Sequence, residues 1–329
     1  MPLPIAHETW FVHDDVGADW GFATSSTTLL LLTGAIVITL VVRLIATQFR
    51  TGVDVPTVAS IAPYLPFVMR MHLGVSLVGL LSLGYYLSPT MPLEWTVIRV
   101  LLGALMLVVA IMVFAGWHTN VAAWLLIAAG PVGALEYGIL DIAQRLDLLA
   151  VAVFLLLTGS GRWSADDEAG RAPEFTERRI EQSAWALRML IGITLIFVAY
   201  NEKLAQPDLA LKFLERYPEF NVFDGIGLGT SDLAFTRIAG VIEVLFGLMI
   251  ISGALPQVGV LLIGVPFNLT LFFFGEVELI GHLPIYGTMV VLFVLGASEA
   301  HRQLLMSLWP FGPRSRAQRA AAITPAPAR

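Results

Sequence analysis

Long, mostly apolar stretches recur along most of the chain. They occupy residues 21–42, 71–93, 100–135, 142–161, 184–200, 233–252, 256–275 and 279–298. A helix rises about 1.5 Å per residue, so about 20 apolar residues cross the roughly 30 Å hydrocarbon core of a bilayer. The stretch 100–135 is too long for one crossing, and Gly-Trp-His-Thr-Asn at 116–120 predicts a turn within it. The pattern therefore predicts about nine transmembrane helices.

Composition supports an all-α polytopic membrane protein with the lipid bilayer as its surroundings. Of 329 residues, 57% are hydrophobic and only 13% are charged, which leaves no room for a large soluble domain. The chain has no cysteine, which excludes disulfides, Cys-ligated iron–sulfur clusters and dithiol redox chemistry. The net charge is -6 and no basic block lies outside the carboxyl-terminal tail, so nucleic acid is not an expected partner.

The distribution of basic residues predicts an orientation. If the tail is cytoplasmic, that side holds most of the arginines, including Arg43, Arg162 and Arg302, as the positive-inside rule requires. We therefore expect a multi-pass protein of the bacterial inner membrane with its amino terminus outside and its carboxyl terminus in the cytoplasm. The predicted units are an outer segment at 1–20, a leading helix at 21–50, a first four-helix repeat at 62–161, a cytoplasmic linker at 162–183, a second four-helix repeat at 184–300 and a cytoplasmic tail at 301–329.

The two repeats are predicted from internal similarity. VMRMHLGVSLVGLL at 68–81 aligns with ALRMLIGITLIFVA at 186–199, which pairs Arg70 with Arg188. At shifts of 137 or 138 residues, the turn at 116–118 falls on 253–256. At the shift of 137 residues, 141–145 falls on 278–282. Within the first repeat, Asp141 and Arg145 are predicted to form an ion pair.

Glu243 is the main candidate for chemistry because it lies well inside a predicted span. An ionisable group there costs about 2.5 to 3.5 kcal/mol on insertion scales, so it needs a partner or a purpose. One hypothesis is a structural carboxylate paired with Arg99, Arg237 or Lys203 from helix ends. The other is a proton or ligand site.

A second group of candidates lies at the start of the last span. Glu278, His282 and Tyr286 are spaced by four residues and share one helix face. This pattern suits metal binding, proton relay or a hydrogen bond to a quinone carbonyl. The alternative is a hydrogen-bonding cluster that only caps the helix entry.

Further polar residues surround these candidates. Asn201, Glu202 and Lys203 end the sixth predicted helix and open a long excursion whose amphipathic stretch, from Pro207 to Tyr217, predicts an interfacial helix. His7 and His13 flank Trp10 in the outer segment and are weak candidates for copper or zinc, against an aromatic anchor at the membrane interface. His72 and His118 allow a bis-histidine haem, without any further haem signature.

Three segments resemble the DoxX family of small membrane proteins. They are RIAGVIEVLFGLMIISGALPQVGVLLIG at 237–264, the pair Lys203-Leu204, and Thr-Gly-Ser-Gly-Arg-Trp-Ser-Ala-Asp at 158–166. The likeness extends over roughly two thirds of the chain, more closely in the second repeat. It implies a four-helix bundle with Glu243 and Lys203 at family-like positions, where the first repeat has Leu105 and Tyr85.

The resemblance also implies a direction for function, because some family members are subunits of thiosulfate:quinone oxidoreductases or accompany quinol oxidases. We therefore expect a subunit or accessory of a quinone-linked redox system with an outward-facing polar site. Its catalytic groups would be Glu243, Lys203 and His282, and its suggested cofactor quinone. A periplasmic or membrane oxidoreductase would be its partner. The alternative is a non-catalytic permease, scaffold or assembly partner, and whether the chain is an enzyme stays open.

Overall fold

The computed structural model describes residues 8–12, 16–49 and 51–312, and within these ranges the regular structure is helical, without a strand. Seven helices in this part of the chain are long and apolar enough to cross a membrane. They are α3 (Ser26–Gln48), α5 (Leu65–Ser82), α6 (Val97–Ala115), α7 (Thr119–Tyr137), α11 (Glu177–Ala199), α14 (Asp232–Ser252) and α16 (Glu276–Gly296). An all-α polytopic architecture is therefore confirmed.

One predicted span is shorter than expected. The stretch 142–161 contains α9 (Leu146–Thr158), whose 13 residues are too few for a full crossing. Helix α15 (Pro256–Phe274) has 19 residues and follows the predicted span 256–275. The count of nine crossings stays a prediction.

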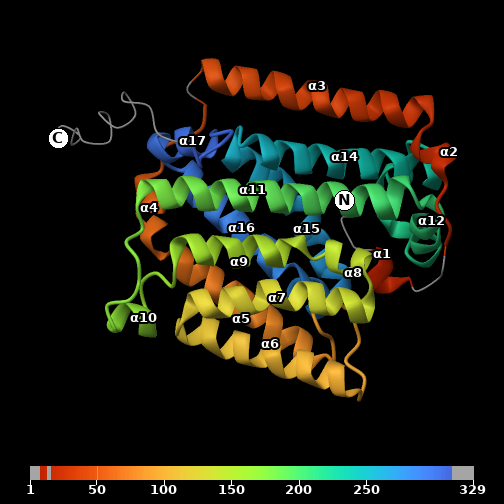
Figure 1. The fold of residues 1–329 in the computed structure, drawn as a ribbon. Coiled ribbons are helices and arrows are strands. Elements are labelled where there is room, and N and C mark those ends of the chain that lie inside the picture. The colour runs from red at the N-terminus through yellow and green to blue at the C-terminus, as the bar shows by residue number, and fades with distance from the viewer. Residues whose placement is uncertain (1–7, 13–15, 50, 313–329) are drawn as a thin grey trace.

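The long helices run side by side between two ends, as Figure 1 shows. The "α10 end" carries α4 (Pro56–Ala59), α10 (Ala165–Glu168) and α17 (Glu299–Leu305), and the "α12 end" carries α1 (Glu8–Phe11), α2 (Trp20–Ala23), α8 (Ile139–Ala143) and α12 (Pro207–Arg216). The short helix α13 (Val222–Gly225) shares a buried apolar cluster with α12. Hydroxyl side chains cap several long helices, since Ser25, Thr96, Thr176 and Ser231 each accept a hydrogen bond from an N–H in the first turn.

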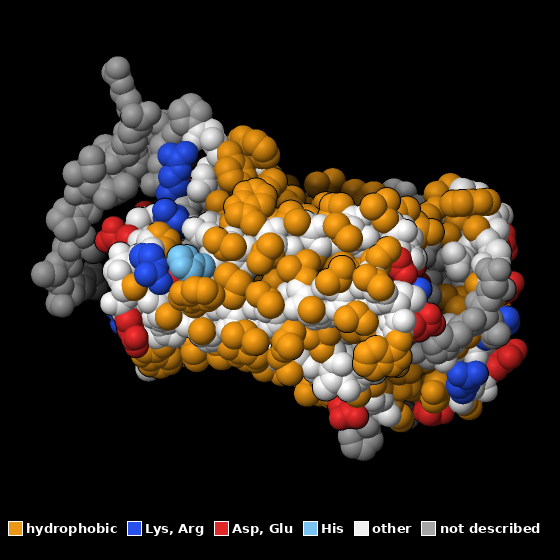
Figure 2. Space-filling view, turned by 60° about the horizontal axis from the view of Figure 1, so that its bottom comes forward, with side chains coloured by type: hydrophobic (Ala, Val, Ile, Leu, Met, Phe, Trp, Pro, Cys, Tyr) orange, Lys and Arg blue, Asp and Glu red, His pale blue; other side chains and the backbone are white. Residues whose placement is uncertain are grey.

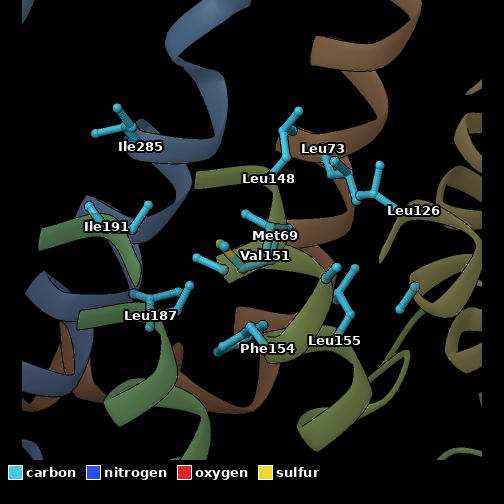
Figure 3. Close-up of a cluster of buried hydrophobic side chains, with 14 of the residues drawn as sticks. Met69, Leu73, Leu126, Leu148, Val151, Phe154, Leu155, Leu187, Ile191 and Ile285 are labelled. Atoms are coloured by element: carbon cyan, nitrogen blue, oxygen red, sulfur yellow. The ribbon is translucent and has the colours of Figure 1, made fainter. Parts of the chain in front are cut away.

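The interior is apolar between the two ends. Figure 3 shows Met69, Leu73, Val151, Phe154 and Ile191 among the side chains that α5, α9 and α11 bury together. Figure 2 shows the outer surface, where hydrophobic side chains cover the middle of the bundle and charged ones lie toward the ends. This distribution is that of a protein whose middle faces lipid.

Helix α3 lies at the edge of the bundle and packs mainly on α14. Much of its surface is exposed, including Leu30, Leu40 and Leu44. Only 17% of its apolar window is buried, the smallest share among the seven candidate spans of the described chain.

Several sequence predictions need correction. The fifth predicted helix, 142–161, is broken between α8 and α9, because Arg145 turns into the bundle instead of continuing the helix. Arg145 pairs with Asp147 at 3.1 Å, so the predicted pair with Asp141 is wrong. Helix α11 begins at Glu177, so the end of the predicted linker is helical, and α17 extends ordered structure into the predicted tail.

Some matched positions of the predicted repeats have matching backbones. Gly116 and Gly253 both end a helix in the left-handed conformation, with φ of 60° and 67°. Two residues later, His118 and Leu255 also have positive φ, 46° and 50°. A left-handed residue is costly for any side chain other than glycine, so its recurrence at matched turns agrees with a duplication. The repeat itself stays a prediction.

Candidate functional site

The site begins where α11 ends in a π-helical turn, Tyr200–Leu204. A π turn widens the helix locally and is frequent at functional sites. Here it buries two adjacent charged residues, since Glu202 and Lys203 are 0% and 1% exposed. Gly240 of α14 has no side chain to hold this turn away, and its Cα lies beside the Lys203 and Leu204 side chains. The π turn therefore places the side chains of Glu202 and Lys203 inside the helix bundle at the α12 end.

Lys203 lies between two carboxylates from distant parts of the chain. Its Nζ is 3.2 Å from Oε2 of Glu243 on α14, and 2.8 Å and 3.0 Å from the two carboxylate oxygens of Glu8 on α1. All three side chains are buried. The second Glu243 oxygen, Oε1, has no hydrogen-bond partner among the described residues. Of the three basic partners proposed for Glu243, the structure supplies Lys203.

The amino-terminal helix α1 closes this site. The Thr9 hydroxyl donates a 2.8 Å hydrogen bond to Glu202, and Glu8 interacts directly with the Glu202 carboxyl group. Trp10 is 5% exposed and lies against Gly281 of α16, where a Cβ atom would come within 2.3 Å of its ring. The prediction that Trp10 anchors the outer segment at the membrane interface is therefore wrong, because its ring is inside the bundle.

Helix α16 adds the remaining polar groups. His282 lies with its ring centroid 4.8 Å from that of Trp10 and 5.0 Å from that of Phe267. Its Nδ1 is 3.0 Å from the Glu278 carbonyl oxygen, which can only accept, so Nδ1 carries the hydrogen in this contact. Glu278 is buried and within electrostatic range of Lys203 and Glu8. Together Glu8, Glu202, Glu243 and Glu278, with Lys203 and His282, form what we call the acidic cluster.

The acidic cluster contains more acid than base. Among the described residues, four carboxyl groups, one lysine and one histidine come together here, and all six side chains are buried. Burial raises the pKa of Glu8 to about 8, and the neighbouring Glu202 raises it further against the opposing effect of Lys203. Since an unpaired buried charge costs several kcal/mol, the closed site favours the protonated form of Glu8.

Other predicted site residues lie elsewhere or at its margin. Arg237 donates to the Thr28 hydroxyl at 3.1 Å and covers the Phe22 ring, so it faces α3 and α2. Arg99 pairs with Glu94 and Glu136, each at 2.7 Å. These contacts place both arginines outside the acidic cluster.

Asn201 and Tyr286 lie next to cluster residues. Asn201 is half-buried in the same π turn as Lys203. Tyr286 is one turn beyond His282, and its hydroxyl is buried without a hydrogen-bond partner among the described residues. Each is therefore available as a contact at the rim of the cluster.

The metal prediction gains no support in the described part of the chain. No group of three or more His, Asp or Glu side chains there is arranged to hold a metal ion. This includes Glu278 and His282, while His7 and His13 lie outside the described residues.

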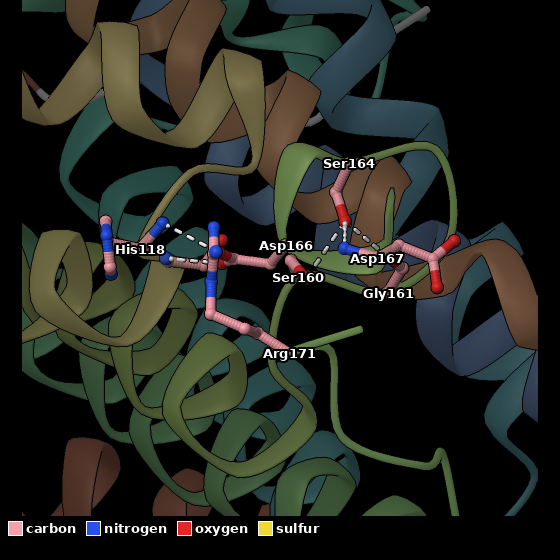
Figure 4. A network of polar contacts seen from close by, with 8 residues as sticks. His118, Ser160, Gly161, Ser164, Asp166, Asp167 and Arg171 are labelled. Atoms are coloured by element: carbon pink, nitrogen blue, oxygen red, sulfur yellow. Dashed lines mark hydrogen bonds and ion pairs between the residues drawn. The ribbon is translucent and has the colours of Figure 1, made fainter. Parts of the chain in front are cut away.

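A second polar network lies at the α10 end (Figure 4). Asp166 accepts hydrogen bonds at 3.0 Å from the backbone N–H groups of His118 and Thr119, and two from the Arg171 guanidinium. Burial opposes ionisation of Asp166, but these hydrogen bonds outweigh it and lower its pKa. The segment 158–166 therefore holds the start of α7 in place through Asp166, which is a structural task.

Comparison with protein-family models, curated proteins and solved structures found no match for this chain.

Proposed function

We propose that the chain is an integral membrane component of a quinone-linked redox system and that its acidic cluster exchanges protons with a polar ligand. The observation that supports this proposal most strongly is the excess of buried carboxyl groups around Lys203. A redox reaction of a quinone takes up or releases protons, and a cluster of buried carboxyl groups is suited to supply or receive them.

Within this proposal α1 acts as a removable plug. Glu8 neutralises Lys203, and Trp10 fills the space beside His282 and Phe267. A ligand with an aromatic ring and an oxygen acceptor has the same two features. Its ring would take the place of Trp10, while Lys203 or His282 would donate to its oxygen and Glu243 or Glu278 would move the proton.

The apolar interior favours this proposal over a permease. Leu195, Val291, Leu292 and Leu295 are buried on α11 and α16 between the acidic cluster and the α10 end. A transport path for a polar solute would need polar groups through this region. The acidic cluster instead lies toward one end of the bundle, the α12 end.

The test is mass spectrometry of the small molecules and proteins that co-purify with the detergent-extracted protein. We expect a quinone or a membrane oxidoreductase with the wild-type protein and its loss in Glu243→Gln and His282→Ala variants. Glu136→Gln is the matched control, because that carboxylate pairs with Arg99 outside the cluster. Equal profiles without a quinone in all four proteins would refute the proposal, and solute uptake into vesicles would then identify a permease.

A further inference from the structure

A groove separates α3 from α11 and α14 near the α10 end. Its volume is about 280 Å³, and its walls are mostly apolar, with Ile36, Leu40, Met189, Leu248 and Ile251 among them. Two arginines, Arg43 and Arg188, line the same groove with Ser252 and Ser307. None of the described residues that line it is acidic. The groove therefore combines an apolar wall with two positive charges.

Arg188 is buried but poorly satisfied. It is 2% exposed, and its Nη2 donates to the Ser307 carbonyl oxygen at 2.9 Å. Its Nε and Nη1 have no hydrogen-bond partner among the described residues. A guanidinium has five N–H donors, and leaving them unpaired in the interior is costly.

Arg70 matches Arg188 in the first predicted repeat, and each of its guanidinium nitrogens has a hydrogen-bond partner. Its Nε donates to Ser160, its Nη1 to Val113 and Phe114, and its Nη2 to Trp163, all to carbonyl oxygens at 2.8–3.1 Å. The unpaired donors of Arg188 are therefore not a general property of an arginine at this level of the bundle.

Arg43 increases the positive charge at this point. It donates to the carbonyl oxygens of Ser252 and Met306, and it is close enough to Arg188 for the two charges to repel. Phosphate is the group that two neighbouring guanidinium ions bind best, because its oxygens accept paired hydrogen bonds and neutralise both charges. Since Ser252 ends α14, the charges lie at a helix end, where lipid head groups meet the protein.

We propose that this groove binds an anionic phospholipid. Its phosphate would accept hydrogen bonds from Nε and Nη1 of Arg188 and face Arg43. One acyl chain would lie along Ile36, Leu40 and Leu248, under α3. The binding site shares no residue with the acidic cluster, which is built around the π turn at the other end of α11.

Native mass spectrometry tests this inference on the full chain. The detergent-purified protein is titrated with phosphatidylglycerol or with phosphatidylcholine of the same acyl chains. We expect wild-type protein to bind phosphatidylglycerol at least tenfold more tightly, and Arg188→Gln to lose that preference. Arg178→Gln removes an exposed arginine from the same helix outside the groove and should retain it.

Two further measurements keep the inference falsifiable if Arg188→Gln fails to fold. Leu40→Trp fills the apolar wall and should weaken binding of phosphatidylglycerol while leaving both arginines in place. Arg43→Gln should reduce the preference for the anionic lipid. Equal binding of the two lipids, equal effects of the Arg188 and Arg178 substitutions, or displacement of phosphatidylglycerol by inorganic phosphate at similar concentration would each overturn the proposal.

Discussion

Docking of α1 on the acidic cluster should depend on pH. Burial raises the pKa of Glu8 from 4.5 to about 8, so the docked segment binds a proton over a range in which the released segment does not. Docking is therefore strongest below pH 4.5, weakens as pH rises toward 8, and changes little above that. Each pH unit between 4.5 and about 8 weakens docking by about 1.4 kcal/mol, so the docking free energy changes by roughly 5 kcal/mol over this range.

The groups facing Glu8 determine how many protons take part. They are Glu202 and Lys203 from the π turn, Glu243 from α14, and Glu278 and His282 from α16. Lys203 opposes the effect, because its positive charge favours the ionised carboxylate. For Glu8 alone, the released population should rise by up to about tenfold per pH unit between pH 5 and 8.

A single introduced cysteine measures this population, since the chain has no native cysteine. Val12 directly follows α1 and is 3% exposed, so Val12→Cys reacts with a maleimide only when α1 is released. Leu228→Cys, an exposed position, corrects for the pH dependence of the thiol itself. The corrected rate for Val12→Cys should rise steeply with pH.

Adding Glu8→Gln to this variant removes the titrating group. Its labelling should match that of the parent near pH 5 and be slower than the parent above pH 8, because glutamine carries no charge to bury. The reasoning would be refuted if the two cysteine positions gave parallel pH profiles, or if Glu8→Gln retained the full slope.

Three further substitutions have defined outcomes. Lys203→Met should lower the free energy of unfolding in detergent by about 3 kcal/mol, because it leaves buried carboxylates without their counter-charge. Gly281→Ala should release α1 and raise the Val12→Cys labelling rate at every pH, because its Cβ would overlap the Trp10 ring. Asp166→Asn should cost about 1–2 kcal/mol of unfolding free energy at pH 7, and this difference should vanish as acid protonates Asp166, whose pKa is lowered in the fold.

Each of these has a matched control. Arg178→Met removes an exposed cation of α11 outside the acidic cluster and should change stability little. Gly259→Ala adds the same methyl group where no atom lies within 4 Å, so labelling should stay at the parent rate. Asp167→Asn changes an exposed neighbour of Asp166 and should leave stability at neutral pH unaltered. A control that behaved like its test variant would contradict the corresponding argument.

The sequence predicted the long helices and part of the site because both follow from local patterns. Lys203 lies just after α11 and Glu243 lies near the middle of α14, the next long helix, and antiparallel packing of the two helices brings the side chains together. Arg237 was also predicted as a partner of Glu243, but it contacts Thr28 and Phe22 instead. Six residues separate it from Glu243, about one and two-thirds helical turns, so the two side chains leave α14 on different faces.

The part that sequence reasoning missed depends on distant contacts. Glu8 and Lys203 are 195 positions apart, and nothing local distinguishes Glu8 from other acids of the outer segment. Its neighbours His7 and Trp10 suggested a metal site or an interfacial anchor. The sequence analysis already placed three acids, Glu202, Glu243 and Glu278, near a single lysine. This imbalance of charge gave no reason to expect a fourth acid. The structure nevertheless adds Glu8.

The two predicted repeats differ most where their polar groups enter the bundle at the α12 end. In the first, Arg145 is permanently charged and is paired with Asp147, while its Nη1 donates to the Gly281 carbonyl oxygen. The position matching Arg145 in the second is His282, whose charge depends on protonation. A fixed ion pair can support the fold but offers no free proton donor or acceptor, whereas the second repeat brings Nδ1 of His282 to 3.4 Å from a Glu278 carboxylate oxygen. If the halves arose by duplication, the first kept a pair that braces α16 and the second acquired the polar groups that α1 covers. Under the proposed function, this division of roles is the reason why α1 docks on α16 and the π turn.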